Sequence, residues 1–351
     1  MTQVQVSHQR IEKKRIFKLI KVTLIAVLTI VLITAAFTIW TPQPTIWLAR
    51  LLSSKIGPDN FGSKPSDLPE LMVQTQMISD ISYPSKYHEN KIDLYLPQGD
   101  SKPLPVIIFI HGGGFVMGDK FMPANYSRAL ASDGFAVISM NYELAPEATL
   151  FDQTKQVGEV WSYLQQLAQK YPLDPSRVIF AGSSAGAFLA GEFALIQTNT
   201  EYAKLVGIPQ LVPTNTIKGL LLYSAPYDIT AFQHSDVNPV QQFMLKRMGW
   251  GILGDKNWMN NPKFDVLNLS KYITKDFPPA FVTDGNTNSF EKQARVFVAA
   301  LQDKGVQVTS LFFDPAVMKA GHGFQFDMAS PASIRSLKQT KEFLKEVTTS
   351  S

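Results

Sequence analysis

The chain has 351 residues, 45% of them hydrophobic, which allows a large folded domain and excludes a disordered or fibrous protein. Its formal net charge is +4, but residues 1–21 carry six basic side chains and one acidic side chain, so this segment holds +5 and the rest of the chain −1. That distribution argues against a nucleic-acid-binding surface on the main part of the chain. The absence of cysteine excludes disulfide bonds and thiolate metal sites.

Residues 22–40 form an uncharged run of 19 residues that predicts a transmembrane helix, because a helix of this length covers about 30 Å of hydrocarbon. The basic residues 1–21 would then form a cytoplasmic tail, and the rest of the chain would lie on the extracytoplasmic side of the cell membrane. The alternative is a cleaved signal peptide, for which Ile33-Thr34-Ala35 offers a small-residue site. We favour a signal anchor, because the apolar core of a signal peptide usually has only about 7–15 residues.

Between the membrane segment and the main domain, residues 41–70 predict a juxtamembrane helix followed by a linker. The helix is expected over residues 42–52, and the glycine, proline and polar content of residues 57–70 indicates the linker. The main folded domain is expected to span residues 71–349.

Short apolar runs alternate with helical patterns through this domain. The runs lack polar alternation, as do the strands of a parallel sheet that is covered on both faces. Strands are predicted at residues 106–110, 136–140, 178–181, 220–223, 280–283 and 308–313, after an antiparallel pair within 75–96. Helices are predicted at residues 152–170, 185–197, 289–304 and 332–347. The predicted fold class is therefore α/β, doubly wound, with a mainly parallel central sheet.

Residues 231–275 interrupt this alternation and are rich in aromatic and methionine side chains. We interpret this stretch as a small helical cap over a binding site. The alternative is a hydrophobic cluster that packs against the domain without contacting a ligand.

The segment Gly182-Ser183-Ser184-Ala185-Gly186 lies between a predicted strand and a predicted helix. A serine flanked by small residues at such a sharp turn is typical of a nucleophile elbow, in which the hydroxyl is exposed at the start of the helix. The pattern alone is weak, because short glycine and serine clusters also occur in ordinary turns. Its position between strand and helix makes Ser184 a candidate nucleophile.

A second motif, His111-Gly112-Gly113-Gly114, follows an earlier predicted strand. Loops of this kind supply backbone N–H groups that stabilise an oxyanion. We expect His111 to fix the shape of the loop rather than to titrate.

Together with the segment from Tyr142 to Glu147, these motifs make the chain similar to the hormone-sensitive-lipase-like carboxylesterases of the α/β-hydrolase fold. The resemblance covers about residues 71–348. It implies that Ser184 is the nucleophile, that Gly113, Gly114 and Ala185 donate the oxyanion-hole N–H groups, and that the Tyr142 segment is structural. A membrane anchor is not typical of this family, so that expectation rests on the sequence alone.

The candidate general base is His322, since the chain order of an α/β-hydrolase triad is serine, acid, histidine. Of the five histidines, the other four are His8, His88, His111 and His234. The first three precede Ser184, and His234 lies at the start of the predicted cap. Only His322 lies after the last predicted strand and before the final helix.

The acid of the triad is less clearly marked. The resembling family places it at about the position of Asn288, and an asparagine cannot stabilise an imidazolium as a carboxylate does. Asn288 and Glu291 have the spacing of a helix N-cap box, which predicts a structural role for Asn288. We favour Asp284, at the end of a predicted strand, and keep Asp228 as the second candidate and a Ser–His dyad as the third.

The sequence therefore predicts a membrane-anchored serine carboxylesterase or lipase-like hydrolase that needs neither a metal nor an organic cofactor. Its partners would be a small-molecule or lipid-like ester and the membrane. A related acyl hydrolase, either a peptidase or a deacetylase of envelope polymers, is the alternative enzyme. A catalytically silent binding protein with the same fold is favoured only by the displaced acid.

Overall fold

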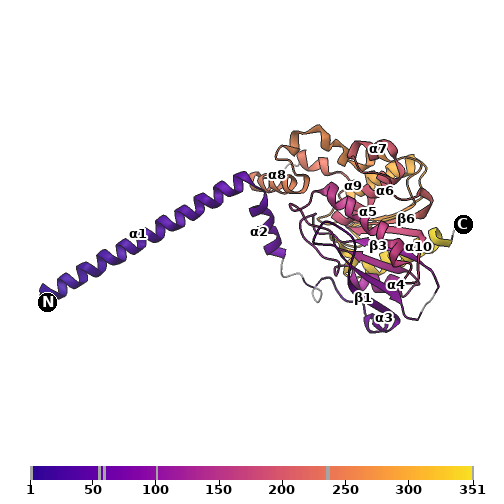
Figure 1. Cartoon of the computed structure of the whole chain (residues 1–351), viewed down its shortest axis with the longest axis horizontal. Coiled ribbons are helices and arrows are strands. Elements are labelled where there is room, and N and C mark those ends of the chain that lie inside the picture. Colours follow the sequence, from indigo (N-terminus) through magenta and orange to yellow (C-terminus); the bar gives the residue numbers. More distant parts are fainter. Residues whose placement is uncertain (1–2, 54–56, 58–60, 100–101, 235–237, 350–351) are drawn as a thin grey trace.

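The computed structural model describes residues 3–53, 57, 61–99, 102–234 and 238–349 (Figure 1). Helix α1, Gln3–Trp40, projects away from the folded domain, and α2, Gln43–Ser53, returns to pack on it. By length and composition, the part of α1 from Lys14 to Trp40 is suited to cross a membrane, and its apolar window is not buried by the rest of the chain. The helix is continuous, so the basic segment and the apolar run belong to one element.

A central sheet organises the domain. Its eight strands have the order β1-β2-β4-β3-β5-β6-β7-β8. Strands β1 and β2 pair antiparallel, β2 joins β4 antiparallel, and every pairing from β4 to β8 is parallel. The strands span Thr75–Ser82, Lys91–Pro97, Leu104–Ile110, Ala136–Met140, Leu173–Ser183, Ile217–Tyr223, Ala280–Thr283 and Val308–Leu311. The predicted mainly parallel sheet and its antiparallel leading pair are confirmed.

Helices cover both faces of this sheet, which explains why its central strands are apolar on both sides. Helices α5, α6 and α9 pack on one face, and α4 and α10 pack on the other. Their bounds are Ala124–Ala131 (α4), Leu150–Leu167 (α5), Ala185–Thr198 (α6), Glu291–Asp303 (α9) and Pro331–Thr349 (α10). Shorter helical segments span Leu68–Gln74 (α3), Thr200–Val206 (α7), Thr214–Thr216 (η1) and Phe324–Phe326 (η6).

Strand register aligns the ends of four neighbouring strands. Ile110 of β3 pairs with Gly182 of β5, Ser183 pairs with Tyr223 of β6, and Tyr223 pairs with Thr283 of β7. The carboxyl ends of these parallel strands therefore meet at one edge of the sheet, where ligands bind in open α/β sheets. The residues that follow these strands are the candidate site residues and the residues that hold them in position.

The predicted cap lies between β6 and β7 as one helix and several short 3₁₀ turns. Its helix is α8, Pro239–Leu253, and the turns are Ile229–His234, Trp258–Asn260, Pro262–Leu267 and Leu269–Tyr272. Trp258 and Phe264 are buried in the hydrophobic core, whereas Met248 of α8 lines the cavity described below. Different side chains of this stretch therefore pack in the core and line the cavity.

Candidate active site

Ser184 lies at a sharp turn between β5 and α6. Its backbone has φ 55° and ψ −121°, a strained conformation for a residue other than glycine. The turn is tight because α6 starts directly against the end of β3: a Cβ built on Gly186 would lie 2.1 Å from the Ile110 carbonyl oxygen. Only glycine fits at that position, so the local sequence determines where the Ser184 hydroxyl points.

The glycine loop passes directly beside this serine. A Cβ on Gly112 would lie 3.2 Å from the Cβ of Ser184, and both Gly113 and Gly114 line the same cavity as Ser184. Gly113 and Gly114 have φ of 118° and 60°, which a residue with a side chain rarely adopts. Ala185 is the first residue of α6, where N–H groups lack partners within the helix. The three expected N–H donors therefore come from adjoining segments around Ser184.

His111 and Tyr142 stabilise the conformation of this glycine loop. Tyr142 Oη donates a hydrogen bond of 3.0 Å to the His111 carbonyl, and the two rings stack with centroids 4.3 Å apart. Nδ1 of His111 lies 2.7 Å from the Gly112 carbonyl oxygen. Burial lowers the pKa of His111 to about 4, so it stays neutral near pH 7 and supports the loop, as expected from the sequence.

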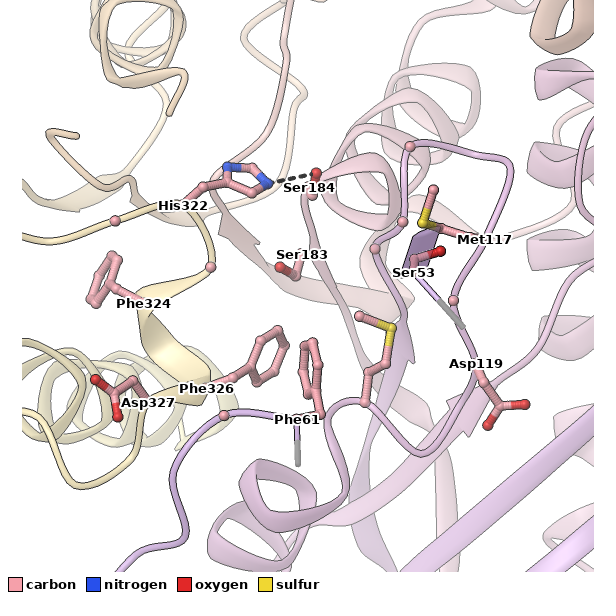
Figure 2. Close-up of a pocket in the computed structure, with 18 of the residues that line it drawn as sticks. Ser53, Phe61, Met117, Asp119, Ser183, Ser184, His322, Phe324, Phe326 and Asp327 are labelled. Carbon is pink, nitrogen blue, oxygen red and sulfur yellow. Dashed lines mark hydrogen bonds between the residues drawn. The ribbon is translucent and has the colours of Figure 1, made fainter. Parts of the chain in front are cut away.

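The predicted base, His322, lies in the loop between β8 and α10 and lines the same cavity as Ser184. Its Nε2 is 2.9 Å from Ser184 Oγ (Figure 2). The ring of Phe290 meets the imidazole edge-on, with centroids 5.3 Å apart. Burial lowers the pKa of His322, which favours the neutral form that a general base requires.

The preferred acid, Asp284, is connected to His322 through Ser289, a residue that no sequence motif marks. Asp284 follows the end of β7 and is fully buried. Its Oδ1 accepts a hydrogen bond from the Ser289 hydroxyl, and Ser289 Oγ lies 2.8 Å from Nδ1 of His322. The observed chain is therefore Ser184–His322–Ser289–Asp284, with one hydroxyl placed between histidine and acid.

The hydroxyl of Ser289 has a single proton, and this fixes the direction of the chain. When Asp284 is ionised, it accepts that proton, and Ser289 Oγ then accepts the proton on Nδ1 of His322. Nε2 of His322 is then unprotonated and accepts from Ser184 Oγ. This is the histidine tautomer that removes a proton from the serine.

One expectation about the region of the acid is wrong. Asn288 is not a helix cap: α9 begins at Glu291 after Phe290, without a side-chain cap, and Asn288 has φ 49°, a left-handed conformation that asparagine tolerates. The second candidate, Asp228, accepts hydrogen bonds from Thr230 and from Asn268, which tie it to a turn at the base of the cap. Those bonds give Asp228 a structural role.

Burial raises the pKa of Asp284 to about 7, and the hydrogen bond from Ser289 opposes this shift. A buried carboxylate whose protonation changes near neutral pH is typical of a functional site.

A family model described as BD-FAE matches residues 92–300, more than half of the chain. The chain belongs to the BD-FAE family. The matched residues contain Ser184, both loop glycines, Asp284 and Ser289, and they end before His322. Membership of this esterase-like family confirms the expectation of a serine hydrolase that acts on esters.

Several solved structures that are similar to this BD-FAE protein are esterases. Esterase B from Lactobacillus rhamnosis, solved in a C6-C4 SN3-inhibited form, is 22% identical, with a TM-score of 0.72 over 88% of this chain and 97% of its own. EstE1, a thermophilic carboxylesterase from a metagenomic library, is 17% identical, with a TM-score of 0.61 over 88% and 97%. The Pyrobaculum calidifontis esterase is 18% identical, with a TM-score of 0.61 over 81% and 90%. These similarities confirm the α/β-hydrolase fold.

In this BD-FAE protein, a cavity of about 910 Å³ opens above Ser184 and His322. Part of its wall comes from outside the hydrolase domain predicted from the sequence: Arg50 and Ser53 belong to α2, and Phe61 follows it. Figure 2 shows Ser53 and Phe61 around the same space as Ser184. The sequence predicts only a juxtamembrane helix and a linker for this segment, because its local pattern carries no information about the domain on which it packs.

Proposed function

We propose that the chain is a membrane-anchored serine carboxylesterase in which Ser184 is the nucleophile and His322 the general base. The observation that carries this proposal is the 2.9 Å contact between Ser184 Oγ and His322 Nε2 at the floor of the cavity. Asp284 acts on His322 through Ser289, which serves as a positioning residue. The direct test is hydrolysis of p-nitrophenyl butyrate by the purified full chain.

The reaction follows from the direction of the hydrogen bonds. His322 Nε2 takes the proton of Ser184 as its oxygen attacks the ester carbonyl, and the N–H groups of Gly113, Gly114 and Ala185 stabilise the oxyanion. The imidazolium then gives the proton to the departing alcohol, which leaves an acyl group on Ser184. Water, activated by His322, attacks this acyl-enzyme and releases the carboxylic acid.

Ser289 keeps the Nδ1 proton of His322 in place during these steps. When His322 becomes charged, its Nδ1–H points at Ser289, whose own proton points at the Asp284 carboxylate. The negative charge of Asp284 thereby favours the imidazolium across one hydroxyl. The alternative of a catalytically silent binding protein was favoured only by the displaced acid. That argument no longer applies, because Asp284 remains connected to His322 through Ser289.

The pH dependence of turnover tests this relay. The pKa of Asp284 is raised to about 7, so the carboxylate is present above that pH and protonated below it. A protonated Asp284 can donate to Ser289, which then donates to Nδ1 and leaves the proton of His322 on Nε2. We expect kcat/KM to rise with pH through a midpoint near 7. Ser289→Ala should lower kcat by roughly 10- to 100-fold and move that midpoint.

Two variants control for a merely structural effect of Ser289→Ala. Ser289→Thr keeps the hydroxyl and should retain most of the activity and the midpoint near 7. Thr287→Ala removes an exposed hydroxyl in the same loop, one that donates only to its neighbour Asn286, and should leave both unchanged. A Ser289→Ala enzyme with the wild-type pH profile would contradict the relay.

We assign α1 as the anchor. Six basic residues precede its apolar run, and in the positive-inside rule such a cluster stays in the cytoplasm, which places the hydrolase domain on the extracytoplasmic side. Protease added to intact cells should then digest the domain after Trp40 and spare residues 1–21. Recovery of a protected domain of full size would refute this topology. A membrane-free mature chain that begins near Ala36 would instead indicate a cleaved signal peptide.

A further inference from the structure

The juxtamembrane helix α2 is fixed on the hydrolase domain by Arg50, a half-buried side chain that makes hydrogen bonds to two carbonyls and one ion pair. Arg50 donates from Nε to the Val116 carbonyl at 2.7 Å and from Nη2 to the Ala145 carbonyl at 2.8 Å. It also pairs with Glu147, at 2.7 Å. Val116 follows the oxyanion loop and Ala145 lies within the Tyr142–Glu147 segment, so α2 is tied to the same elements that build the active site.

The junction between α1 and α2 is held by the cap helix α8. Arg247 donates to the Thr41 carbonyl at 2.7 Å, and Ile46 is fully buried. A Cβ on Gly251 of α8 would lie 2.3 Å from Cδ1 of Ile46, so this glycine permits the close approach. The end of α1 therefore has a fixed direction relative to the cap and the cavity.

The outer face of α2 is apolar and exposed. It is formed by Trp47, Leu48, Leu51 and Leu52. This face continues onto the end of α1, where the rings of Phe37 and Trp47 lie 6.1 Å apart and Trp40 is exposed. Because the apolar run of α1 ends only two residues before α2 begins, a bilayer that holds α1 also lies against this face.

The same helix supplies part of the cavity wall. Ser53, the last residue of α2, and Phe61 line the cavity together with Met117, Met248 and Phe326. Methionine and phenylalanine suit a hydrocarbon chain, and methionine adapts to chains of different shape. One end of the active-site cavity is thus bounded by the element whose opposite face would contact the bilayer.

We infer that α2 docks on the lipid bilayer and that the substrate is an ester carrying a hydrocarbon chain that resides in that bilayer. This inference rests on the proposed function and specifies its substrate class. Such an ester passes from the membrane along α2 into the cavity without exposing its chain to water, which would be unfavourable. The scissile carbonyl then lies at Ser184, and the chain lies against the apolar wall.

The test uses the full chain reconstituted in phosphatidylcholine vesicles. Two substrates are compared: 4-methylumbelliferyl palmitate dissolved in the bilayer and water-soluble p-nitrophenyl acetate. The double variant Leu48→Glu/Leu52→Glu places two charges on the outer face of α2, at side chains that are 47% and 75% exposed. We expect hydrolysis of the bilayer ester to fall by about 10-fold or more and hydrolysis of the acetate to stay unchanged.

A matched control is Leu205→Glu/Leu211→Glu, at leucines that are 59% and 47% exposed. Leu205 lies on α7, well apart from α2 (Figure 1). This variant should hydrolyse both esters at the wild-type rate, and melting temperatures verify that both variants fold.

Undiminished hydrolysis of the bilayer ester by the α2 variant would overturn the inference, as would an equal loss on both esters. If the wild type hydrolyses the acetate but not the palmitate, the substrate class is wrong while the esterase function stands. If it hydrolyses neither, the proposed function itself fails.

Discussion

Replacing Ser184 or His322 by alanine is expected to lower ester turnover by roughly 10³-fold or more. Each change removes a member of one proton-transfer unit whose two atoms lie 2.9 Å apart. Because such members act together, the double variant should be little slower than either single variant. The measurement is kcat for p-nitrophenyl butyrate, with a melting temperature for each protein.

His88→Ala is the control for histidine removal, since His88 is exposed and its backbone makes the contacts: its N–H donates to Glu143 and its carbonyl accepts from the Asn90 N–H. It should retain wild-type turnover. A His322→Ala enzyme with near-normal activity would refute the assignment of the base, and strictly additive losses in the double variant would refute the coupling.

Asp284→Asn is expected to lower kcat by roughly 10²- to 10⁴-fold while preserving the fold. The asparagine oxygen can still accept the hydrogen bond from Ser289, so the geometry is kept and the charge that favours the imidazolium is lost. Asp228→Asn is the matched control and should have little effect on kcat, because its bonds to Thr230 and Asn268 serve a turn. A folded Asp284→Asn enzyme with undiminished turnover would exclude Asp284 as the acid.

Although Asp284→Asn is expected to lower kcat, it is expected to stabilise the folded protein at high pH. The pKa of Asp284 is raised to about 7 in the folded protein, so folding takes up a proton between the unfolded pKa near 4 and that value. The stabilising contribution of protonated Asp284 is present at low pH and is lost as the pH rises through 7, where the buried carboxyl group becomes charged. Asp284→Asn should therefore raise the melting temperature relative to the wild type at pH 8, and by less at pH 5.

Sequence patterns predicted those parts of the site that are built locally. Strands β4 and β7 have the predicted bounds, because their apolar runs end where the chain leaves the sheet. Ser184 and the glycine loop were identifiable because the close approaches at Gly186 and Gly112 require glycine itself.

Ser289 was not predicted, because its contact with His322 depends on how two loops 33 residues apart fold together. One feature of the sequence does point to a sharp turn before Ser289. Asn288, a residue type that tolerates a left-handed backbone conformation, directly precedes it. The cavity wall formed by Arg50 and Phe61 was also missed. Its position depends on long-range contacts, such as that between Arg50 and Ala145, that no local pattern contains.

The central claim is that Ser184 is a nucleophile activated by His322. Its most direct measurement is to treat the full chain with a serine-directed fluorophosphonate and locate the adduct by peptide mass spectrometry. We predict stoichiometric modification of the peptide that contains Ser184, with labelling slowed strongly in His322→Ala and absent in Ser184→Ala. Failure of the wild-type protein to react, or an adduct on another residue, would contradict the account.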